Sequence, residues 1–503
     1  MNFLKDNLRK IREYIADAPL ALKASIAYMV VNFMQKGVSF LTAPIFTRVL
    51  STADYGKVSV YTSWVEIMGM FAMFGVYDNV YNNGYLEYEH DRNNMTWSML
   101  LFSNFMTCVT FLVVWFVNHS VYHFLQVSDI LLCFMFLCFL FEPAFEFWKI
   151  QQRFHYRYKA ACVYAIFVMI GSPIFALSGI FLFPGYKVEA RIIGAQLVTV
   201  LLGICCYALE WFRSNKKVDF KYWKYTFTFN LPLFPYMISA FILNCCDRIM
   251  ISYMEGDSAA GIYSIAYTAA AIVGIVWTSI NSAMMPIIYK RCYDNRMDTL
   301  SDILLPLQTF YGIVCVTVMA LAPEVIRFLA PSSYGDGMYA VPAIIAGTFF
   351  NTGYSIFSIP IIAQKKQKYV TYVGVFTSIL NIILNLLLIP RFGYLAAGYT
   401  TLASYFIQYI GTYIFLPGIL GERIYRKDRI AVNSALVVAS AIIFPLIYRW
   451  LWIRYLLLAA LYDLEEPECA AEAARSRFFV TVQSSSKVET QALQVYLRKA
   501  VLA

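Results

Sequence analysis

Long apolar runs separated by short polar segments form the main pattern along this chain. A hydrocarbon layer about 30 Å thick is crossed by a helix of about 20 residues, so each run of that length predicts one membrane-spanning helix. Thirteen runs are long enough, and charged residues gather between them. They fall at 24–47, 58–81, 96–117, 129–148, 159–183, 190–211, 227–250, 260–287, 302–322, 338–362, 369–389, 394–417 and 430–448.

The spacing within these runs predicts helices rather than strands. No run alternates apolar and polar residues over the length of a barrel strand, so the expected fold class is an all-α polytopic membrane helical bundle. Residues 1–23 differ, because five basic residues interrupt a weak apolar spacing. This segment is typical of an amphipathic helix that lies at the cytoplasmic membrane interface.

The basic residues predict how the chain is oriented. Lys and Arg are concentrated in alternate polar segments, among them 149–159, 213–225 and 365–368. Short cytoplasmic loops of membrane proteins carry an excess of these residues. The segments rich in Lys and Arg all fall on one side of the membrane, and the N-terminus lies on that same side. We therefore expect a cytoplasmic N-terminus.

An internal repeat relates the two halves of the pattern. Four landmark residues of the first half recur in the second half after 200 to 206 residues. The pairs are Arg48 and Arg248, Gly56 and Gly261, Pro184 and Pro390, and Gly194 and Gly398. Each repeat holds an even number of helices, so both halves enter the membrane in the same direction, as in parallel-repeat transporters.

This repeat predicts a domain organisation. We expect six-helix lobes at 24–212 and 226–417 around a central cavity, joined by a cytoplasmic linker at 213–225. Residues 418–462 add one or two helices. Residues 463–503 form a polar tail to which no role is assigned.

The composition excludes a soluble enzyme and a nucleic-acid-binding protein. Of the 503 residues, 60% are hydrophobic and 14% are charged, whereas soluble proteins average about 25% charged residues. The net charge of +9 comes without a continuous basic stripe, so nucleic acid is not an expected partner. The 11 cysteines show no zinc-binding spacing, and no metal site is expected.

Several motifs follow one another along the chain. They are Arg48–Gly56, Asp247–Ser252 with Gly261–Tyr267, and Asn381–Asn385 with Ile389–Gly393 and Ala396–Thr400. Taken together and in order, they resemble those of bacterial polysaccharide repeat-unit flippases, the Wzx-like proteins, and the resemblance covers about residues 20–450. That family is similar in fold to lipid II flippases and multidrug/cation antiporters, which share its superfamily.

The resemblance implies a function that composition alone does not. It implies export of a lipid-linked oligosaccharide, usually carried on undecaprenyl diphosphate, to the outer leaflet by alternating access, for O-antigen, lipopolysaccharide or capsule assembly. It implies a bacterial inner membrane, with membrane lipids, a polysaccharide polymerase and a chain-length regulator as partners. No cofactor or catalytic residue is expected, and coupling to an H+ or Na+ gradient stays open.

Lys36 is the first candidate for a functional residue. It lies inside the first run, about 18 Å of helix from Lys23 and from Arg48. An ionisable group at this depth is unfavourable by roughly 2.5–3.5 kcal/mol and normally faces protein or water. With Asn32 one turn earlier, it predicts a polar stripe that lines the cavity and compensates a diphosphate. The alternative is a structural ion pair with a neighbouring helix.

Charged residues in the second and seventh runs are further candidates. Glu66 is either the partner of such an ion pair or a site for a coupling cation. Asp247 and Arg248 stand at the end of the seventh run, as Arg48 stands at the end of the first. One interpretation is an interfacial ion pair and anchors; the other makes Arg48 and Arg248 a basic gate for substrate, with Asp247 as a coupling-ion candidate.

Two further sets are interpreted as structural. Glu142 and Glu146 share a helix face near Lys149 and Arg153, which predicts a solvated interfacial network rather than acid–base chemistry.

Asn381 and Asn385 also share a face and predict hydrogen bonds between helices. Pro232 and Pro235 predict a break in the seventh helix, which is tolerated beside a cavity.

Two alternative functions stay open. One is a cation-coupled exporter of small amphipathic compounds, and the other is a membrane polysaccharide polymerase or glycosyltransferase. An enzyme is disfavoured because the sequence shows no glycine-rich phosphate loop, no HExxH motif and no nucleophile–base pattern.

Overall fold

Each of the thirteen predicted runs is helical in the computed structural model. The structure describes residues 20–121, 124–155, 157–293, 300–364, 366–420 and 427–460, and none of these lies in a strand. The long helices are α2 (Leu20–Val49), α3 (Thr52–Met73), α5 (Arg92–Ser120), α6 (Asp129–Phe154), α7 (Tyr158–Leu182), α8 (Lys187–Arg213), α9 (Phe220–Asn230), α10 (Phe234–Glu255), α11 (Asp257–Tyr293), α12 (Ser301–Ala320), α14 (Val341–Ala363), α15 (Lys368–Phe392), α16 (Tyr394–Leu420) and α17 (Lys427–Ile447).

Short elements connect these helices. They are the π-helix η1 (Val76–Val80), α4 (Tyr81–Glu87), the 3₁₀ helices η2 (Glu89–Asp91) and η3 (Leu231–Leu233), α13 (Ala322–Leu329) and the 3₁₀ helix η5 (Ser332–Tyr339). A helix at Leu451–Ala460 follows α17.

The helices have the length and composition of membrane spans. Within the described residues, nine helices are long and apolar enough to cross a membrane, and ten if α12 and α13 form one span bent by 63°. Of the remaining predicted spans, α2, α3 and α16 hold 30, 22 and 27 residues and pack in the same bundle. The protein is therefore a multi-pass membrane protein, as predicted.

Local sequence accounts for where several helices start and stop. Ser51 caps α3 in a capping box with Asp54, whose carboxylate accepts from the Ser51 backbone. At the other end of α3, Phe74 and Gly75 both have positive φ, and the Asn230 amide donates to the carbonyls of both. The predicted break in the seventh span is confirmed, because η3 separates α9 from α10.

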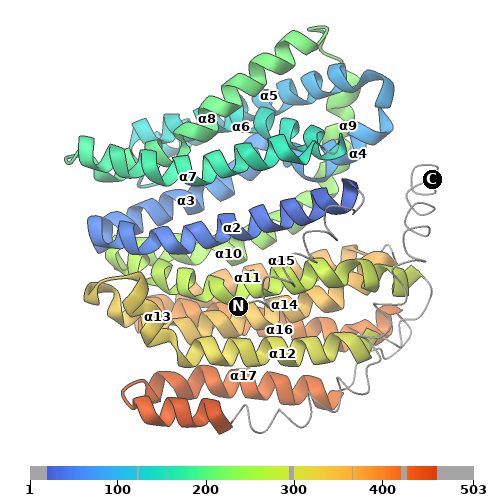
Figure 1. Ribbon diagram of the computed structural model, residues 1–503. Coiled ribbons are helices and arrows are strands. Elements are labelled where there is room, and N and C mark those ends of the chain that lie inside the picture. The colour runs from blue at the N-terminus through green and yellow to red at the C-terminus, as the bar shows by residue number, and fades with distance from the viewer. Residues whose placement is uncertain are drawn as a thin grey trace, which may run out of the picture.

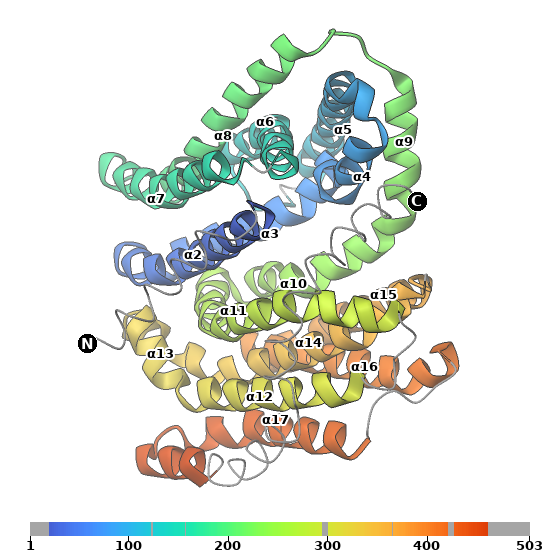
Figure 2. The ribbon, with the colours of Figure 1, turned by 45° about the vertical axis from the view of Figure 1, so that its right-hand side comes forward.

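The helices form two groups that meet along α2 and α3. In the first group α7 packs on α8, α6 on α8 and α3 on α5; in the second, α14 packs on α16, α10 on α15 and α12 on α17. Figure 1 shows α2 and α3 lying between the rest of the first group and α10 and α11. Figure 2 shows α9 running down the side of the bundle from the first group to the second. The exact lobe boundaries and the repeat relation stay predictions.

The connections differ from the sequence prediction in length. Only residues 214–219 of the predicted linker 213–225 are non-helical, because Asp219 caps α9 and starts it at Phe220. Of the predicted N-terminal segment, 1–19 lies outside the described residues, and the rest begins α2. Residues 421–426 and 461–503, with the polar tail, also lie outside them.

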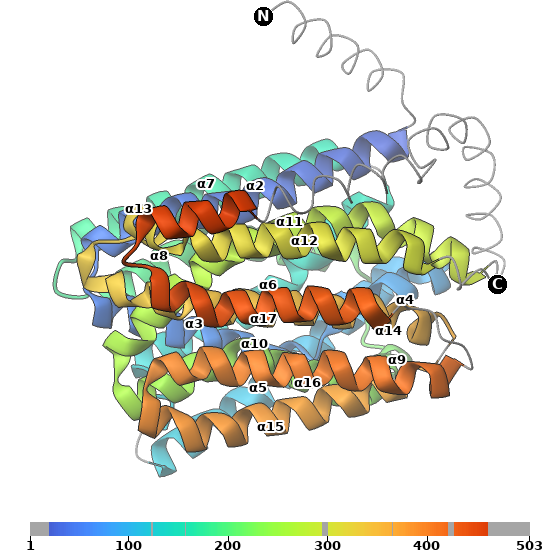
Figure 3. The ribbon, with the colours of Figure 1, turned by 90° about the horizontal axis from the view of Figure 1, so that it is seen from below.

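The last helix is held by a buried ion pair. Arg454 donates to both carboxylate oxygens of Glu324 in α13, at 2.9 and 2.8 Å, and to the carbonyl of Ala320 at 2.7 Å. Arg454 is buried, whereas Trp452 and Leu456 are 84% and 70% exposed. This helix therefore turns its basic residue inward and its apolar residues outward, where lipid would lie. Figure 3 shows this helix, in red, following α17.

Candidate transport site

Small residues of α3 and α11 bring the two groups into direct contact. The Thr52 and Ser258 hydroxyls lie 2.6 Å apart, and the Ser59 and Ser264 hydroxyls 2.5 Å apart. Between these bonds, Gly56 and Gly261 let the two backbones touch. A Cβ on Gly56 would lie 1.8 Å from the Asp257 carbonyl oxygen, and one on Gly261 would lie 2.1 Å from that of Thr52. We call these six residues (Thr52, Gly56, Ser59, Ser258, Gly261 and Ser264) the hydroxyl seam.

The hydroxyl seam joins equivalent positions of the predicted repeat. Its hydroxyl pairs are separated by 206 and 205 residues, close to the spacing of the sequence landmarks. When two related units contact each other through the same residues on both sides, the contact lies on a two-fold axis. The separation of the paired hydroxyls thus matches the spacing from which the repeat was predicted, and the repeat relation itself stays a prediction.

Other contacts close the same end of the bundle, where α2 ends and α3 and α11 begin. The Thr47 hydroxyl of α2 donates to the Leu329 carbonyl at 2.8 Å, and the Tyr334 hydroxyl of η5 donates to the Ser51 carbonyl at 3.3 Å. Phe40 of α2 stacks on Phe328 of α13. The Tyr55 ring of α3 also packs edge-on against Tyr334, so the two groups are joined at this end by small polar contacts and by aromatic pairs.

Lys36 lies on the face of α2 that points toward the second group. Phe40 and Thr47, which contact α13, follow it by 4 and 11 residues and so share its side of the helix. The Lys36 side chain is exposed. Asn32 lies in α2, but its side chain lies outside the described residues. Arg48 is exposed and donates to the Pro44 carbonyl of its own helix at 2.7 Å.

Glu66 contacts α10 and not Lys36. Its carboxylate accepts a hydrogen bond from the Cys245 thiol at 2.6 Å. Within the part of the chain that the structure describes, no ion pair joins Glu66 to Lys36. The alternative prediction for Lys36 and Glu66 was a structural ion pair between them. The described residues do not form that pair in this conformation. Arg248, three residues after Cys245, lies with its guanidinium 4.5 Å from the centre of the Tyr267 ring.

Asp247 is fully buried inside the second group, which corrects its predicted position at a span end. α10 continues to Glu255, so Asp247 lies two turns inside the helix rather than at the interface. One carboxylate oxygen accepts from Tyr263 at 2.6 Å and from Thr401 at 3.3 Å, and the other has no hydrogen-bond partner. Asp247 and Arg248 therefore face different partners, and the predicted interfacial ion pair is not formed.

A chain of amides and hydroxyls extends from Asp247 across α15 and α16. Asn381 donates to the Thr401 hydroxyl at 3.3 Å and accepts from the Asn385 amide at 3.2 Å. Asn385 in turn accepts from the Thr400 hydroxyl. The predicted hydrogen bonding of both asparagines between helices is confirmed. We call Asp247, Tyr263, Thr401, Asn381, Asn385 and Thr400 the Asp247 network, in which every member is buried.

The Asp247 network has the chemistry of a small-cation or proton site. A buried carboxylate is stable when it is protonated or when it is paired with a cation. Every group of the network offers an oxygen, the donor type that hard cations prefer. In the residues that the structure describes, no three His, Cys, Asp or Glu side chains gather as a metal site. A cation here would therefore take neutral oxygens for most of its ligands.

The predicted network on α6 forms in part. Lys149 pairs with Glu146 at 2.5 Å and lies over the Phe145 ring. Glu142 lies one turn before Glu146 on the same helix, and Arg153 is exposed and takes no part in the pair. Of the four residues, only Glu146 and Lys149 therefore form the predicted contact, and the solvated network as a whole stays a prediction.

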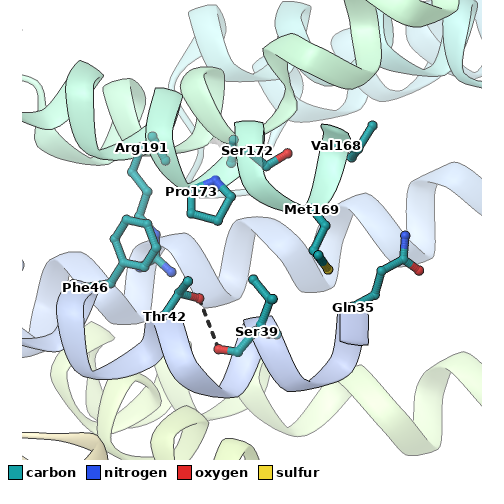
Figure 4. A pocket seen from close by; sticks show the side chains of 12 residues that line it. Gln35, Ser39, Thr42, Phe46, Val168, Met169, Ser172, Pro173 and Arg191 are labelled. Atoms are coloured by element: carbon teal, nitrogen blue, oxygen red, sulfur yellow. Dashed lines mark hydrogen bonds between the residues drawn. The ribbon is translucent and has the colours of Figure 1, made fainter. Parts of the chain in front are cut away.

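A groove between α2, α7 and α8 holds a residue that the sequence analysis missed. It has a volume of about 290 Å³ and runs from Gln35 to Arg191, as Figure 4 shows. Arg191 stands near the start of α8, where an arginine is not unusual in sequence. The seam hydroxyls were missed too. Extending the spacing of 205 residues between Gly56 and Gly261 pairs Ser59 with Ser264 and comes within one residue of pairing Thr52 with Ser258.

Comparison with known proteins gives one family. The family described as polysaccharide biosynthesis protein matches residues 21–291. The Lsg locus putative protein 1 of Haemophilus influenzae is 20% identical over 283 residues, covering 55% of this chain and 67% of that protein. An uncharacterized membrane protein of Methanocaldococcus jannaschii is 28% identical over 208 residues, which cover 38% of this chain and 39% of that protein.

Solved structures show the fold. The lipid II flippase MurJ, in an inward closed conformation, covers 87% of this chain and 97% of its own, with a TM-score of 0.64 and 16% identity. An inward-facing multidrug resistance transporter of the MATE family, in the MOP superfamily, covers 76% and 95%, with a TM-score of 0.57 and 11% identity. This chain therefore has the fold that both transporters share.

Proposed function

This chain belongs to the polysaccharide biosynthesis protein family, and from that premise we propose that it is a flippase for a lipid-linked oligosaccharide. The substrate would be a polyprenyl-diphosphate-linked repeat unit, moved from the cytoplasmic to the outer leaflet of a bacterial inner membrane. The orientation rests on the concentration of Lys and Arg in alternate loops. A polysaccharide polymerase and a chain-length regulator would act on the product.

The hydroxyl seam is the observation that carries this proposal. A transporter that alternates between two sides needs a contact between its halves that forms and breaks in each cycle. The seam is built from two hydroxyl pairs and two glycines, so at these positions the two groups meet through small polar contacts, within a larger apolar core that both groups share. Its position on equivalent residues lets the two groups rock about one axis.

Two exposed charged side chains beyond the hydroxyl seam, Glu66 and Lys36, are suited to contact the charged, hydrated headgroup of the substrate. Glu66 follows Ser59 on the same face of α3, and Lys36 lies on the face of α2 that points toward the second group. Both side chains are exposed. We assign Lys36 to the diphosphate, because an ammonium compensates phosphate charge as a point charge. Arg48 and Arg248 remain candidates for the outer end of the path.

We further assign the coupling cation to the Asp247 network. A proton or a small hard cation on Asp247 would change the charge of a fully buried group that contacts α11 and α16. Binding or release there would alter how α10 packs on these helices, and α10 also contacts α3. The network thus lies one helix away from the contact that must open.

Cross-linking the seam tests the proposal directly. Thr52→Cys with Ser258→Cys places two thiols where two hydroxyls are 2.6 Å apart, at an exposed position. Oxidation should lock the two groups together and abolish delivery of polymerised surface glycan. A reducing agent should restore it, since only the disulfide blocks the movement.

Each single-cysteine variant serves as the control for oxidation of the other cysteines, which are present in both. Transport that continues at the wild-type rate with the cross-link complete would contradict the alternating mechanism. A strain that lacks the gene and still makes normal surface glycan would contradict the substrate assignment.

A cation-coupled exporter of small amphipathic compounds is the second candidate, and the Asp247 network is the observation that favours it. A cation site serves either substrate equally well. Efflux of cationic dyes from vesicles that contain the purified chain would separate the two candidates, because a flippase for lipid-linked sugars gives none.

A further inference from the structure

The groove between α2, α7 and α8 has a mainly apolar lining with a few polar side chains and a charged end. Its α2 side carries Gln35, Ser39 and Thr42, and its α7 side carries Ser172. The α2 residues from Gln35 to Phe46 span about 16 Å of helix. Figure 4 shows Gln35 at one end of the groove and Arg191 at the other, beside Phe46.

Arg191 is a cation without a matching anion. Its Nη1 atom is buried and has no hydrogen-bond partner. The guanidinium lies 4.2 Å from the centre of the Phe46 ring and 4.8 Å from that of Tyr55. Among the described residues, no carboxylate lies within ion-pair distance of it, and its nearest polar neighbours are the tyrosines Tyr55 and Tyr334. Stacking on two rings compensates such a charge only in part.

The helices that form the groove also border hydrocarbon. Leu41 and Ile45 of α2 are 61% and 44% exposed, and Ile170 and Ile174 of α7 are 51% and 54% exposed, on faces outside the groove lining. Apolar side chains that stay exposed on a membrane-spanning helix lie against lipid chains. The groove therefore lies between helices that contact the bilayer, from which a lipid can reach it.

The groove is separate from the transport path assigned above. Lys36 and Gln35 are neighbours in sequence, so their side chains leave α2 about 100° apart. The Lys36 face continues to Phe40 and Thr47, which contact α13, whereas the groove face continues to Ser39 and Thr42. The residues that line the groove all belong to the first group of helices.

We propose that this groove binds the phosphate headgroup of a membrane lipid, with Arg191 on the phosphate and the lipid chain along α2 and α7. A guanidinium matches phosphate oxygens with two parallel hydrogen bonds. Hydroxyls and an amide along the groove accept or donate to the rest of the headgroup. The phosphate belongs either to a bulk phospholipid or to a polyprenyl phosphate. The site stands whether or not the chain is a flippase.

Lipid titration of the full chain in detergent, followed by native mass spectrometry, tests this site. The probes are phosphatidylglycerol, undecaprenyl phosphate and diacylglycerol, which lacks phosphate. Arg191→Gln should weaken binding of the phosphate lipids by about tenfold or more, because a charge-assisted bond is lost. Binding of diacylglycerol should not change. Arg391→Gln, at an exposed arginine in the last turn of α15, is the matched control.

Ser39→Trp provides an independent variant, because it fills the groove and leaves the guanidinium in place. It should also weaken binding of both phosphate lipids, and it decides the matter if Arg191→Gln does not fold. Selective binding of undecaprenyl phosphate identifies the source as a polyprenyl lipid, and equal binding identifies any phosphate lipid. Wild-type affinity in both variants, or equal affinity of all three probes, overturns the proposal.

Discussion

Lys36 and Asp247 are both ionisable groups within the membrane-spanning region, but their surroundings differ. The Lys36 side chain is exposed and forms no ion pair within the described part of the chain, whereas Asp247 is fully buried among hydrogen-bond partners. An exposed charge at membrane depth requires water or a charged ligand beside it. A buried charge requires a fixed cation or a proton. The two residues therefore suit different parts of a transport cycle.

Replacing Lys36 tests its assignment to the substrate. Lys36→Ala should lower the rate of glycan delivery by about tenfold or more at equal protein abundance, because a charge-assisted contact to phosphate is lost. Lys36→Arg should keep most of the activity. Lys217→Ala, at an exposed lysine in the 214–219 connection, is the control. Delivery at the wild-type rate by Lys36→Ala would remove this residue from the path.

Replacing Asp247 tests the cation site. Asp247→Asn keeps an oxygen that accepts from Tyr263 but cannot carry a charge or bind a proton at neutral pH. Transport in proteoliposomes should then stop responding to an imposed Na+ or H+ gradient. Asp336→Asn, at an exposed carboxylate of η5, should respond as the wild type does. A variant at Asp247 with an unchanged gradient response would place the coupling elsewhere.

At the scale of helices, α3 and α11 meet closely because both present glycine at the crossing point. Their backbones approach within the distance that a single Cβ would occupy. Small residues are the usual means by which membrane helices approach each other closely. α3 is also fixed at both ends, by the Ser51 cap at one and by Asn230 at the other. Its position relative to α11 is thus set by backbone contacts rather than by bulky side chains.

A methyl group at the crossing should prevent closure of the seam. In the Thr52→Cys, Ser258→Cys background, Gly56→Ala should sharply reduce disulfide formation, since its Cβ would overlap the Asp257 carbonyl. Gly274→Ala on α11 is the matched control, because nothing lies within 4 Å of its added Cβ. That control should cross-link normally and be slightly more stable, by up to about 1 kcal/mol. Equal cross-linking in both variants would mean that the helices do not touch there.

At the scale of the whole molecule, the sequence was sufficient for the helices and insufficient for their contacts. Apolar runs of span length leave few alternatives, so all thirteen predicted helices were found, and Pro232 and Pro235 marked a real break. The seventh span was predicted to end too early, because polar residues such as Asp247 and Arg248 are typical of the membrane interface. Their partners, such as Tyr263 and Thr401, lie on other helices and are invisible to a local pattern.

The candidate functional residues also fall into those that the sequence identifies and those that only the contacts identify. Lys36 stood out because a lysine in an apolar run is rare. Ser59 and Ser264 did not, because serine is common in membrane helices and only their pairing gives them meaning. Arg191 was hidden by its position near a helix start, where arginine is ordinary. The sequence pattern thus identifies residues of a type that is rare in a membrane span. Residues of a common type are identified only through the contacts that the structure shows.

The composition of the hydroxyl seam has a consequence for how fast the protein can work. Each neutral hydrogen bond contributes about 0.5–1.5 kcal/mol net, so the two hydroxyl pairs together favour closure by roughly 1–3 kcal/mol. A difference of that size is about fivefold to about 150-fold in population. The binding energy of a ligand is enough to offset a contribution of this size. The end as a whole is also held by the contacts of Phe40, Thr47 and Tyr334 and by the apolar core around them, so the rate of opening depends on all of these contacts and not on the hydroxyl pairs alone.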